Sequence, residues 1–420
     1  MAMPVSLRFG MKTQSLSNEA TVWLPFIRKS MIARMKPIRY AILANLLVPL
    51  AGMSIDIYLP SLPHMAQAFS TDDSFIQLTM TSFVIAMGFG QYLAGPVSDA
   101  IGRKSLIITA LVIQFITVIT IIHVPFISLI IATRALQGIA CAFMIVPARA
   151  LLNDNFEGNE LKKKFNYLTI SFALAPIVAP FIGGYCEYYF GWRASFYFIL
   201  TYVTILLICM LCLTTETIKS KRPFSMSHLI HNYAIIMANK SYMYRTLFLS
   251  ILFGYTALSS ILGPFIFQNT LDLSAVEYGY VALSLGLAWF LGNLTNRILF
   301  NVEHNIKVIF SLIVQSIMII ILMTLSYFDM ITVASFLVPL FIIIFCAAIM
   351  FAMLVSESLS QFPELAASSN AFLFATTWVA FGAYTFYATW LSVSNVMPMA
   401  LTYLFVNCMC YLLMNKIHSH

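Results

Sequence analysis

Twelve separate runs of apolar residues constrain this chain of 420 residues more than any other feature. A run of about 20 apolar residues, folded as an α-helix, crosses the ~30 Å hydrocarbon core of a bilayer. The runs cover roughly residues 38–60, 75–97, 105–124, 126–149, 166–189, 194–214, 244–267, 276–299, 307–328, 331–354, 368–391 and 395–415. The sequence therefore predicts an all-α integral membrane protein with twelve transmembrane helices.

The composition excludes an ordinary soluble domain. Hydrophobic residues make up 60% of the chain and charged residues only 9%, whereas a soluble domain carries about 25% charge. The formal net charge is +7, but in a membrane protein such an excess indicates which loops stay inside the cell. We therefore expect the lipid bilayer as a partner and expect no nucleic acid.

The distribution of Lys and Arg gives the orientation. Of 23 such residues, 20 fall in the first 36 residues, in every second loop, or at the helix ends beside those loops. Only Arg193 belongs to a loop on the other side, while Arg134 and Arg149 lie within the fourth run. By the positive-inside rule, both termini are expected in the cytoplasm.

The polar stretches divide the chain into four expected units. Residues 1–36 form a basic extension that lacks the apolar core of a signal peptide, and we expect it in the cytoplasm. Six helices follow over 37–214, then a basic cytoplasmic linker over 215–243, then six further helices over 244–415. This pattern predicts two six-helix bundles.

One predicted loop contains an acid, two cations and two glycines within ten residues. Its sequence is Gly95-Pro-Val-Ser-Asp99-Ala-Ile-Gly102-Arg103-Lys104. We expect Gly95 to let a neighbouring helix approach closely. Asp99 is placed to meet a helix N-terminus or an arginine. Gly102 permits a turn with positive φ, and Arg103 and Lys104 hold the loop in the cytoplasm. A weaker copy, Gly292-Asn-Leu-Thr-Asn296, ends the eighth run and replaces the acid by Asn.

Two charged residues inside apolar runs are candidates for proton coupling. Asp56 lies near the outer end of the first run, and Arg134 lies in the fourth. Charge inside the membrane is costly and marks function. Both lie at similar depths, so we predict a direct or water-linked pair facing a cavity. Alternatively, Asp56 only caps a helix end at the interface, or Arg134 only holds two helices together.

The fifth run contains a proline- and glycine-rich stretch, Ala175-Pro176-Ile-Val-Ala179-Pro180-Phe-Ile-Gly183-Gly184. Proline removes backbone donors and bends a helix, and small residues admit a close neighbour. We interpret the stretch as a pliable seal between the two bundles. The alternative is a kinked helix of the kind that any polytopic protein can contain.

These motifs resemble those of the major facilitator superfamily. The 95–104 loop is similar to its signature between helices 2 and 3, Arg134-Ala-Leu-Gln-Gly138 to its helix 4 motif, and the helix 5 stretch to its antiporter motif, except that Ala179 replaces a glycine. Asp56-Ile-Tyr-Leu-Pro-Ser-Leu-Pro63 resembles the bicyclomycin/chloramphenicol resistance (Bcr/CflA) branch of drug:proton antiporters.

The resemblance implies a twelve-helix protein of the bacterial cytoplasmic (inner) membrane that exports a hydrophobic or amphipathic organic compound in exchange for protons. It also implies that Asp99 docks on the start of the eleventh helix, where Ser368-Ser369-Asn370 reads as an N-cap. Neither a cofactor nor a metal is implied, and we expect a monomer.

Polar and aromatic residues within the apolar runs are candidates to line the substrate cavity. They are Asn45, Tyr58, Gln137, Tyr255, Trp289, Phe374 and Trp378. Aromatic rings favour flat or cationic organic ligands, through stacking and cation–π contact. A ligand rich in carboxylates, such as a citrate-type siderophore, would instead bind through Arg134.

The leading prediction is a proton-coupled antiporter for a drug or metabolite, in which Asp56 and Arg134 couple proton movement to transport. The alternative is a proton-coupled transporter of a siderophore or small carboxylated metabolite, working in export or uptake, because one fold serves all of these. An enzyme is not expected, since the sequence shows no cluster of nucleophile, base or metal ligands.

Overall fold

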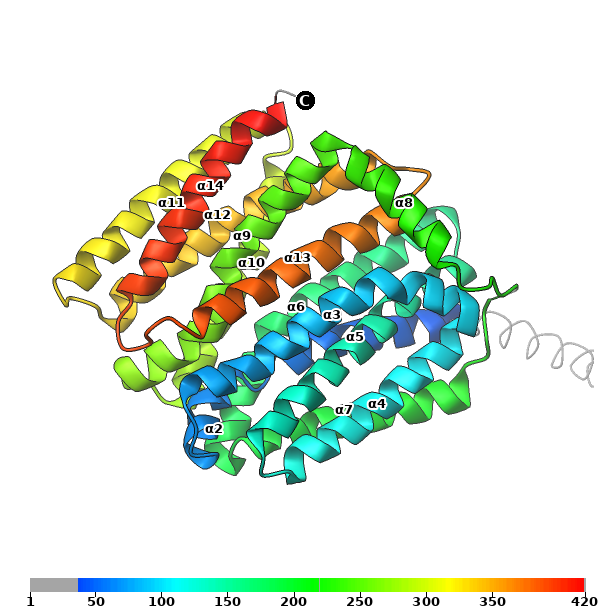
Figure 1. The fold of residues 1–420 in the computed structure, drawn as a ribbon, viewed down its shortest axis with the longest axis horizontal. Helices are drawn as coiled ribbons and strands as arrows, with labels where there is room; N and C mark the ends of the chain where they lie inside the picture. The colour runs from blue at the N-terminus through cyan, green and yellow to red at the C-terminus, as the bar shows by residue number, and fades with distance from the viewer. Residues whose placement is uncertain (1–36, 219, 419–420) are drawn as a thin grey trace, which may run out of the picture.

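The computed structural model describes residues 37–218 and 220–418, and the basic extension 1–36 lies outside the described residues. The described part is almost wholly helical and contains no β-strand (Figure 1). A first helix covers 37–56, and the short helices η1 (Leu59–Ser61) and α2 (Leu62–Ala68) follow it.

Each of the twelve predicted apolar runs corresponds to a long helix in the described residues. After the first helix come α3 (Asp73–Ile101), α4 (Arg103–His123), α5 (Ile127–Asn155), α6 (Gly158–Phe190), α7 (Arg193–Leu213), α9 (Lys240–Phe265), α10 (Ala275–Ile298), α11 (His304–Tyr327), α12 (Val333–Ser360), α13 (Ala366–Ala388) and α14 (Met397–His418). A short π-helix, η2 (Ile266–Thr270), extends α9.

By length and hydropathy, 11 helical spans among the described residues can cross a membrane. The twelfth long helix, α3, is not one of them. Its 29 residues include Gln77, Gln91 and several Thr and Ser side chains, which lower its mean hydropathy. These polar residues are buried against other helices and do not face lipid, so α3 is a transmembrane helix in the interior of the protein.

The long helices form two bundles of six. In the first, α3 packs on α5 and α4 packs on α7; in the second, α10 packs on α12 and α11 packs on α14. Two pairs join the bundles, α3 with α13 and α6 with α10, and we call these pairs the two seams (Figure 1). The fold is the predicted one of twelve transmembrane helices in two six-helix bundles.

Close packing inside the first bundle depends on Gly138 of α5. A Cβ atom at this position would overlap the backbone carbonyl oxygen of Phe83 in α3. Only glycine therefore lets the two helices approach as they do. This approach brings Arg134, one turn earlier on α5, against the Phe83 ring.

The predicted linker 215–243 contains a helix that the sequence analysis did not anticipate, α8 (Met226–Ala238). Its N-cap is Ser225, whose side chain accepts a hydrogen bond from the backbone N–H of His228 at 3.3 Å. His228 and His231 lie on the exposed side of this helix. The three residues Leu229, Tyr233 and Ile236 pack on the protein.

The two ends of the bundles differ in chemistry and are named here for that difference. The basic end carries Gly102, where α3 turns into α4, together with α8 and the first turn of α13. The η1 end carries η1, α2 and the connection between α9 and α10. At the η1 end the bundles touch, because Gln268 of η2 donates a hydrogen bond to the carbonyl oxygen of Pro60 at 3.0 Å.

Candidate functional site

A buried arginine lies at the centre of the first bundle. Arg134 of α5 has an exposed fraction of 0%. Its Nη1 donates a hydrogen bond to Oε1 of Gln137 at 2.9 Å, and its Nε and Nη2 have no hydrogen-bond partner among the described residues. A buried guanidinium with two unused donors is unusual, because buried polar groups normally form hydrogen bonds. It is therefore a candidate to bind a substrate or another charged group.

Aromatic rings flank this guanidinium. Its Cζ lies 4.4 Å from the ring centroid of Tyr58 and 4.5 Å from that of Phe83. Contact with the negative faces of the rings offsets part of the cost of burying the charge. The Tyr58 hydroxyl is in turn fixed by a 3.1 Å hydrogen bond with Thr79 of α3. Tyr58 and Gln137, both predicted cavity residues, are thus immediate neighbours of Arg134.

Asp56 is close enough to Arg134 for an electrostatic interaction, yet the two do not form an ion pair. The prediction of a direct pair is therefore wrong for this conformation, and the water-linked pair stays a prediction. The physical reason is that the Tyr58 and Phe83 rings and the Gln137 amide already surround the guanidinium. Asp56 as a whole residue is partly exposed at the end of the first helix.

The second bundle holds an aromatic cluster at the corresponding place. The ring centroid of Phe253 in α9 lies close to the ring centroids of four other aromatic residues. The distances are 6.3 Å to Trp289, 5.3 Å to Phe351, 6.0 Å to Trp378 and 6.0 Å to Phe381. The structure therefore brings the predicted Trp289 and Trp378 together. The sequence analysis missed Phe253, which joins them, because nothing distinguished it among 35 phenylalanines.

The other predicted cavity residues are more scattered. The prediction that Tyr255 lines the central cavity is wrong for this conformation, because its side chain points into the second bundle. Its ring centroid lies 5.1 Å from that of Tyr403, and its carbonyl oxygen accepts a hydrogen bond from the Tyr403 hydroxyl. Two residues along a helix turn the side chain to nearly the opposite face, so Tyr255 cannot share the direction of Phe253. The Oδ1 atom of Asn45 accepts a hydrogen bond from the hydroxyl of Ser171 in α6 at 2.9 Å.

Phe374 lies where the bundles face each other. The guanidinium carbon of Arg149 in α5 is 5.8 Å from the Phe374 ring centroid in α13. Arg149 is a second cation between the helices of the first bundle, and the sequence analysis gave it no role. Together, Arg134 and Arg149 place two positive charges along one helix, α5.

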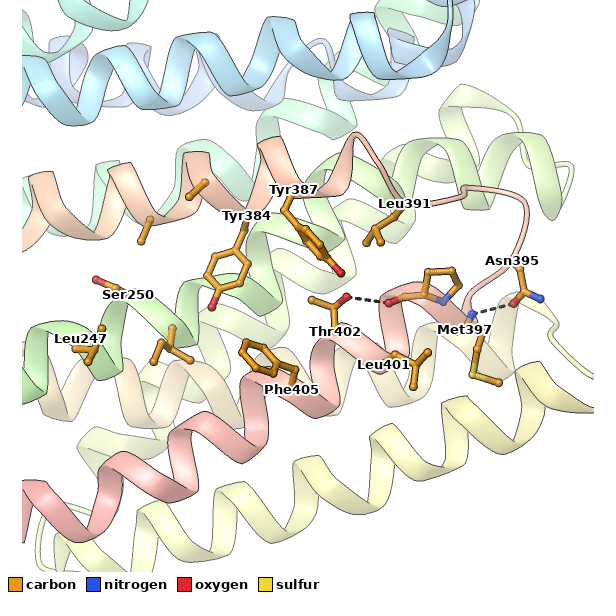
Figure 2. Close-up of a pocket in the computed structure, with 14 residues that line it drawn as sticks. Leu247, Ser250, Tyr384, Tyr387, Leu391, Asn395, Met397, Leu401, Thr402 and Phe405 are labelled. Atoms are coloured by element: carbon orange, nitrogen blue, oxygen red, sulfur yellow. Dashed lines mark hydrogen bonds between the residues drawn. The ribbon is translucent and has the colours of Figure 1, made fainter.

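A large groove lies away from the centre of the protein. It is a groove of about 980 Å³ on the side of the second bundle, between α9, α13 and α14, as Figure 2 shows. Tyr384, Tyr387, Leu401 and Phe405 line it, and none of the predicted cavity residues does.

Glycines close both seams toward the η1 end. A Cβ at Gly382 of α13 would collide with the Ile85 side chain of α3, and one at Gly88 would lie 2.8 Å from Val379. On the other seam, a Cβ at Gly286 of α10 would lie 2.8 Å from Ile177 of α6. These contacts pack the two seams tightly at this level.

The α6–α10 seam opens between Ile177 and the basic end. Ile177, Leu174 and Ile170 lie on one stripe of α6, because they are three and four residues apart. Ile177 is 6% exposed, whereas Leu174 is 45% and Ile170 is 51% exposed. At the basic end of the other seam, a Cβ at Gly95 would meet nothing within 4 Å. We interpret this difference as a conformation that is closed at the η1 end and open at the basic end.

Two predictions about the 95–104 loop are wrong for this conformation. No neighbouring helix packs against Gly95, and Asp99 pairs with Arg103 of the same loop instead of docking on α13. The predicted N-cap at Ser368-Ser369-Asn370 is also wrong, since α13 begins at Ala366 with Leu365 as its N-cap. The bundles are apart at this level, so Asp99 has no helix start within reach.

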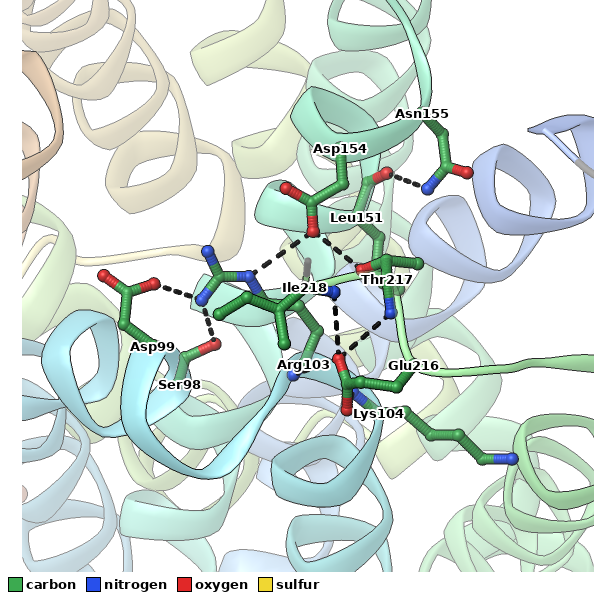
Figure 3. A network of polar contacts seen from close by, with 10 residues as sticks. All are labelled: Ser98, Asp99, Arg103, Lys104, Leu151, Asp154, Asn155, Glu216, Thr217 and Ile218. Atoms are coloured by element: carbon green, nitrogen blue, oxygen red, sulfur yellow. Dashed lines mark hydrogen bonds and ion pairs between the residues drawn. The ribbon is translucent and has the colours of Figure 1, made fainter. Parts of the chain in front are cut away.

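The loop is instead tied into the first bundle by an acidic network (Figure 3). Arg103 donates to the Ser98 hydroxyl at 3.0 Å and lies 3.5 Å from the carboxylate of Asp154, which ends α5. Glu216 accepts from the backbone N–H groups of Arg103 at 2.9 Å and Lys104 at 3.2 Å. A carboxylate at these free N–H groups stabilises the start of α4.

Gly102 adopts the expected positive φ, at 114°. The Glu216 carboxylate occupies the place where a side chain at residue 102 would begin. Glycine is therefore required twice, for the turn and for the carboxylate. The sequence analysis missed Asp154 and Glu216; the signal was that both are acids in otherwise basic surroundings at the ends of predicted helices.

The helix 5 stretch also packs as its small residues predicted. A Cβ at Gly183 would overlap the carbonyl oxygen of Ile57, and one at Gly184 would press on the backbone of Ala275 in α10. Pro176 and Pro180 lie inside α6, and α6 continues through both. Gly183 thus holds α6 against the residue next to Asp56.

We predict a clear difference between two glycine substitutions. Gly183→Ala should lower the free energy of unfolding by about 1–3 kcal/mol, because the added methyl overlaps the Ile57 backbone. Gly95→Ala is the matched control and should be neutral or stabilising, since its site is open and alanine favours helix. Thermal unfolding of the purified protein measures both. Equal stability of the two variants would contradict the packing described here.

Comparison with known proteins identifies the family. The model of the Major Facilitator Superfamily matches residues 45–412. The chain belongs to this superfamily. The predicted recognition is confirmed, and with it the class of membrane transporters.

Curated relatives carry the names of transporters. The chain is 29% identical over 257 residues to an uncharacterized MFS-type transporter, YdgK, of Bacillus subtilis, covering 60% of this chain and 64% of YdgK. It is 29% identical over 238 residues to the bicyclomycin resistance protein homolog of Haemophilus influenzae, covering 56% of this chain and 60% of the relative. It therefore spans less than two thirds of the length of these two.

A longer match agrees with these. The chain is 24% identical over 343 residues to multidrug resistance protein D of Escherichia coli, covering 80% of this chain and 85% of that protein. Among solved structures, the fold is similar to that of a D-xylose-proton symporter, with a TM-score of 0.71, 13% identity, and coverage of 91% of this chain and 97% of that one. The relatives' names agree with the Bcr/CflA resemblance.

Proposed function

We propose that this superfamily member is a proton-coupled antiporter that exports a small hydrophobic or amphipathic organic compound. We place it in the cytoplasmic membrane of a bacterium, with the basic end and both termini in the cytoplasm. The distribution of Lys and Arg supports this orientation. The names of the relatives, which include bicyclomycin and multidrug resistance, support export of a drug-like compound.

The observation that carries the proposal is the arrangement of Asp56 and Arg134. Asp56, a partly exposed residue, lies close enough to interact electrostatically with Arg134, whose guanidinium is fully buried and has two unused donors. Proton coupling needs a carboxylate whose affinity for a proton changes with conformation. Moving Asp56 toward or away from Arg134 as the bundles tilt would produce that change.

The two seams supply the movement. In the described conformation the η1 end is closed by glycine contacts and the basic end is open. Substrate would enter from the cytoplasm between the Arg134 region and the aromatic cluster around Phe253. Release of a proton from Asp56 to the cytoplasm would favour substrate binding, and reprotonation from the outside would favour its release there.

Inverted membrane vesicles test the proposal. A thermal-shift screen of hydrophobic organic compounds, with chloramphenicol and bicyclomycin among them, selects the ligand to follow. Vesicles with an acidic interior should accumulate that ligand, and a proton ionophore should abolish the accumulation. Accumulation only when the interior is alkaline would show uptake instead of export and would refute the antiporter assignment.

A second candidate function has one specific observation in its favour. Arg149 lies against Phe374 in the opposite bundle, so α5 presents two cations toward the centre and Asp56 is the only acid described near them. A substrate with carboxylates, such as a citrate-type siderophore, would be held by both guanidinium groups. Its transport could run in either direction.

Arg149→Gln separates these candidates. If the substrate is a carboxylate, the substitution should raise the apparent Kd about 10-fold or more, because a charge-assisted bond contributes about 1.5–3 kcal/mol. If the substrate is a neutral or cationic drug, the Kd should stay the same or fall. Binding to the purified protein, measured by calorimetry with one citrate-type ligand and one hydrophobic ligand, gives the answer.

A further inference from the structure

Helix α8 lies across the basic end of the α3–α13 seam (Figure 1). The hydroxyl of Tyr233 donates a hydrogen bond to the carbonyl oxygen of Tyr92 in α3 at 2.8 Å. Its ring centroid is 5.7 Å from that of Tyr92 and 5.5 Å from that of Phe372 in α13. Tyr92 and Phe372 are themselves 5.8 Å apart. The three rings form a triangle that draws one residue from each of three helices.

This triangle marks the point where the seam ends. Toward the η1 end, α3 and α13 are in contact, and the Tyr92 hydroxyl bonds Thr376 at 2.7 Å. One turn beyond Tyr92, the site of Gly95 is open. Tyr233 thus occupies the space between the two helices where they begin to separate. Closing the basic end would require this ring to leave.

The remaining surface of α8 is divided by chemistry. Leu229, Tyr233 and Ile236 face the protein, while His228, His231 and the exposed Ile235 lie on the opposite side. Met226, Ile230 and Met237 form a third stripe, because they are four and seven residues apart. These three side chains are 48%, 60% and 55% exposed. A stripe of large apolar side chains on a surface helix needs a cover.

The charges beside α8 indicate what covers it. Lys221 and Arg222 precede the helix and Lys240 follows it, all three exposed, and residues 221–240 contain no acid. A short helix with an exposed apolar stripe and basic flanks binds the interface of an anionic bilayer. That interface adjoins α8, because α8 lies at the membrane end of α3 and α13, which cross the bilayer.

We propose that α8 docks on the anionic headgroup surface of the leaflet at the basic end and, through Tyr233, holds the bundles apart there. The apolar stripe enters the interface and the basic flanks contact lipid phosphates. Anionic lipid thereby favours the conformation that is open at the basic end. The proposal depends on the fold and the membrane, and not on the substrate or on proton coupling.

Pulsed electron resonance between spin labels at Asn159 of α6 and Asn301 after α10 measures the opening, in a background with Cys212 and Cys408 replaced by Ser. Reconstituted protein is compared in vesicles of pure phosphatidylcholine and in vesicles containing 30% phosphatidylglycerol, a proportion of about one anionic lipid in three. We expect the longer distance to gain population in the anionic vesicles, by at least about threefold.

Three variants sharpen the test. Lys221→Gln/Arg222→Gln/Lys240→Gln should remove the lipid effect, and Lys162→Gln/Lys163→Gln/Arg297→Gln, which removes three exposed charges at the same end away from α8, should retain it. Tyr233→Ala should populate the shorter distance in both vesicles. A lipid effect unchanged in the first variant, or a distance distribution unchanged in Tyr233→Ala, would overturn the proposal.

Discussion

Asp56→Asn should reduce substrate-driven proton movement to the level of empty vesicles. Asparagine has nearly the same shape as aspartate but cannot exchange a proton, so the fold should be retained while coupling is lost. Exchange of labelled substrate across the membrane without a gradient should continue, because it needs only the conformational change. Proton flux and exchange are measured in the same proteoliposomes, with a pH-sensitive dye and a labelled ligand.

The matched control is Asp73→Asn, which removes another carboxylate at the η1 end, at the start of α3. It should leave proton flux within about twofold of the native protein, because Asp73 is a partly exposed residue outside the Arg134 site. Proton flux in Asp56→Asn equal to that of the control would place coupling at another residue. The superfamily assignment would not be affected by that result.

Arg134→Met should abolish transport and at the same time stabilise the protein. The guanidinium is fully buried, with two donors unused, and replacing a poorly paired buried charge by an apolar side chain of similar volume is often stabilising, by about 1–4 kcal/mol. Its contacts with the Tyr58 and Phe83 rings offset part of this gain, by about 2 kcal/mol. Thermal unfolding and vesicle transport are measured on the same preparation.

A functional and a structural role for Arg134 give opposite signs in this experiment. If Arg134 only holds helices together, its loss lowers the melting temperature, and transport falls because the protein unfolds. If it acts in coupling, transport is lost while the melting temperature rises or stays constant. Arg134→Lys is the second arm: it keeps the charge but loses the planar group between two rings, and should retain a small part of the activity.

Local features were predictable from the sequence. The apolar runs located the long helices to within a few residues at most boundaries, and Gly102 adopts the predicted left-handed turn. Both follow from short-range physics, namely the length of a membrane-spanning helix and the conformational freedom of glycine. Gly183 likewise makes the close backbone contact that a small residue in that stretch allows.

What the sequence did not predict depends on contacts between distant residues or on conformation. Rings of Tyr58 and Phe83 flank Arg134. Tyr58 was a candidate to line the cavity but not a predicted partner of Arg134, and nothing distinguished Phe83 among 35 phenylalanines. Asp99 does not contact the start of α13 because the conformation is open at the basic end. No local sequence pattern encodes that conformation. Helix α8 was hidden because its polar side and basic flanks gave residues 215–243 the composition of a loop.

Proton release on substrate binding tests the central claim most directly. Purified protein in weakly buffered detergent solution is mixed with the ligand selected by the thermal-shift screen, and a pH indicator reports protons in the medium. Our account predicts release from the native protein and from Asp73→Asn, and none from Asp56→Asn with the ligand still bound. Equal release from Asp56→Asn would contradict it.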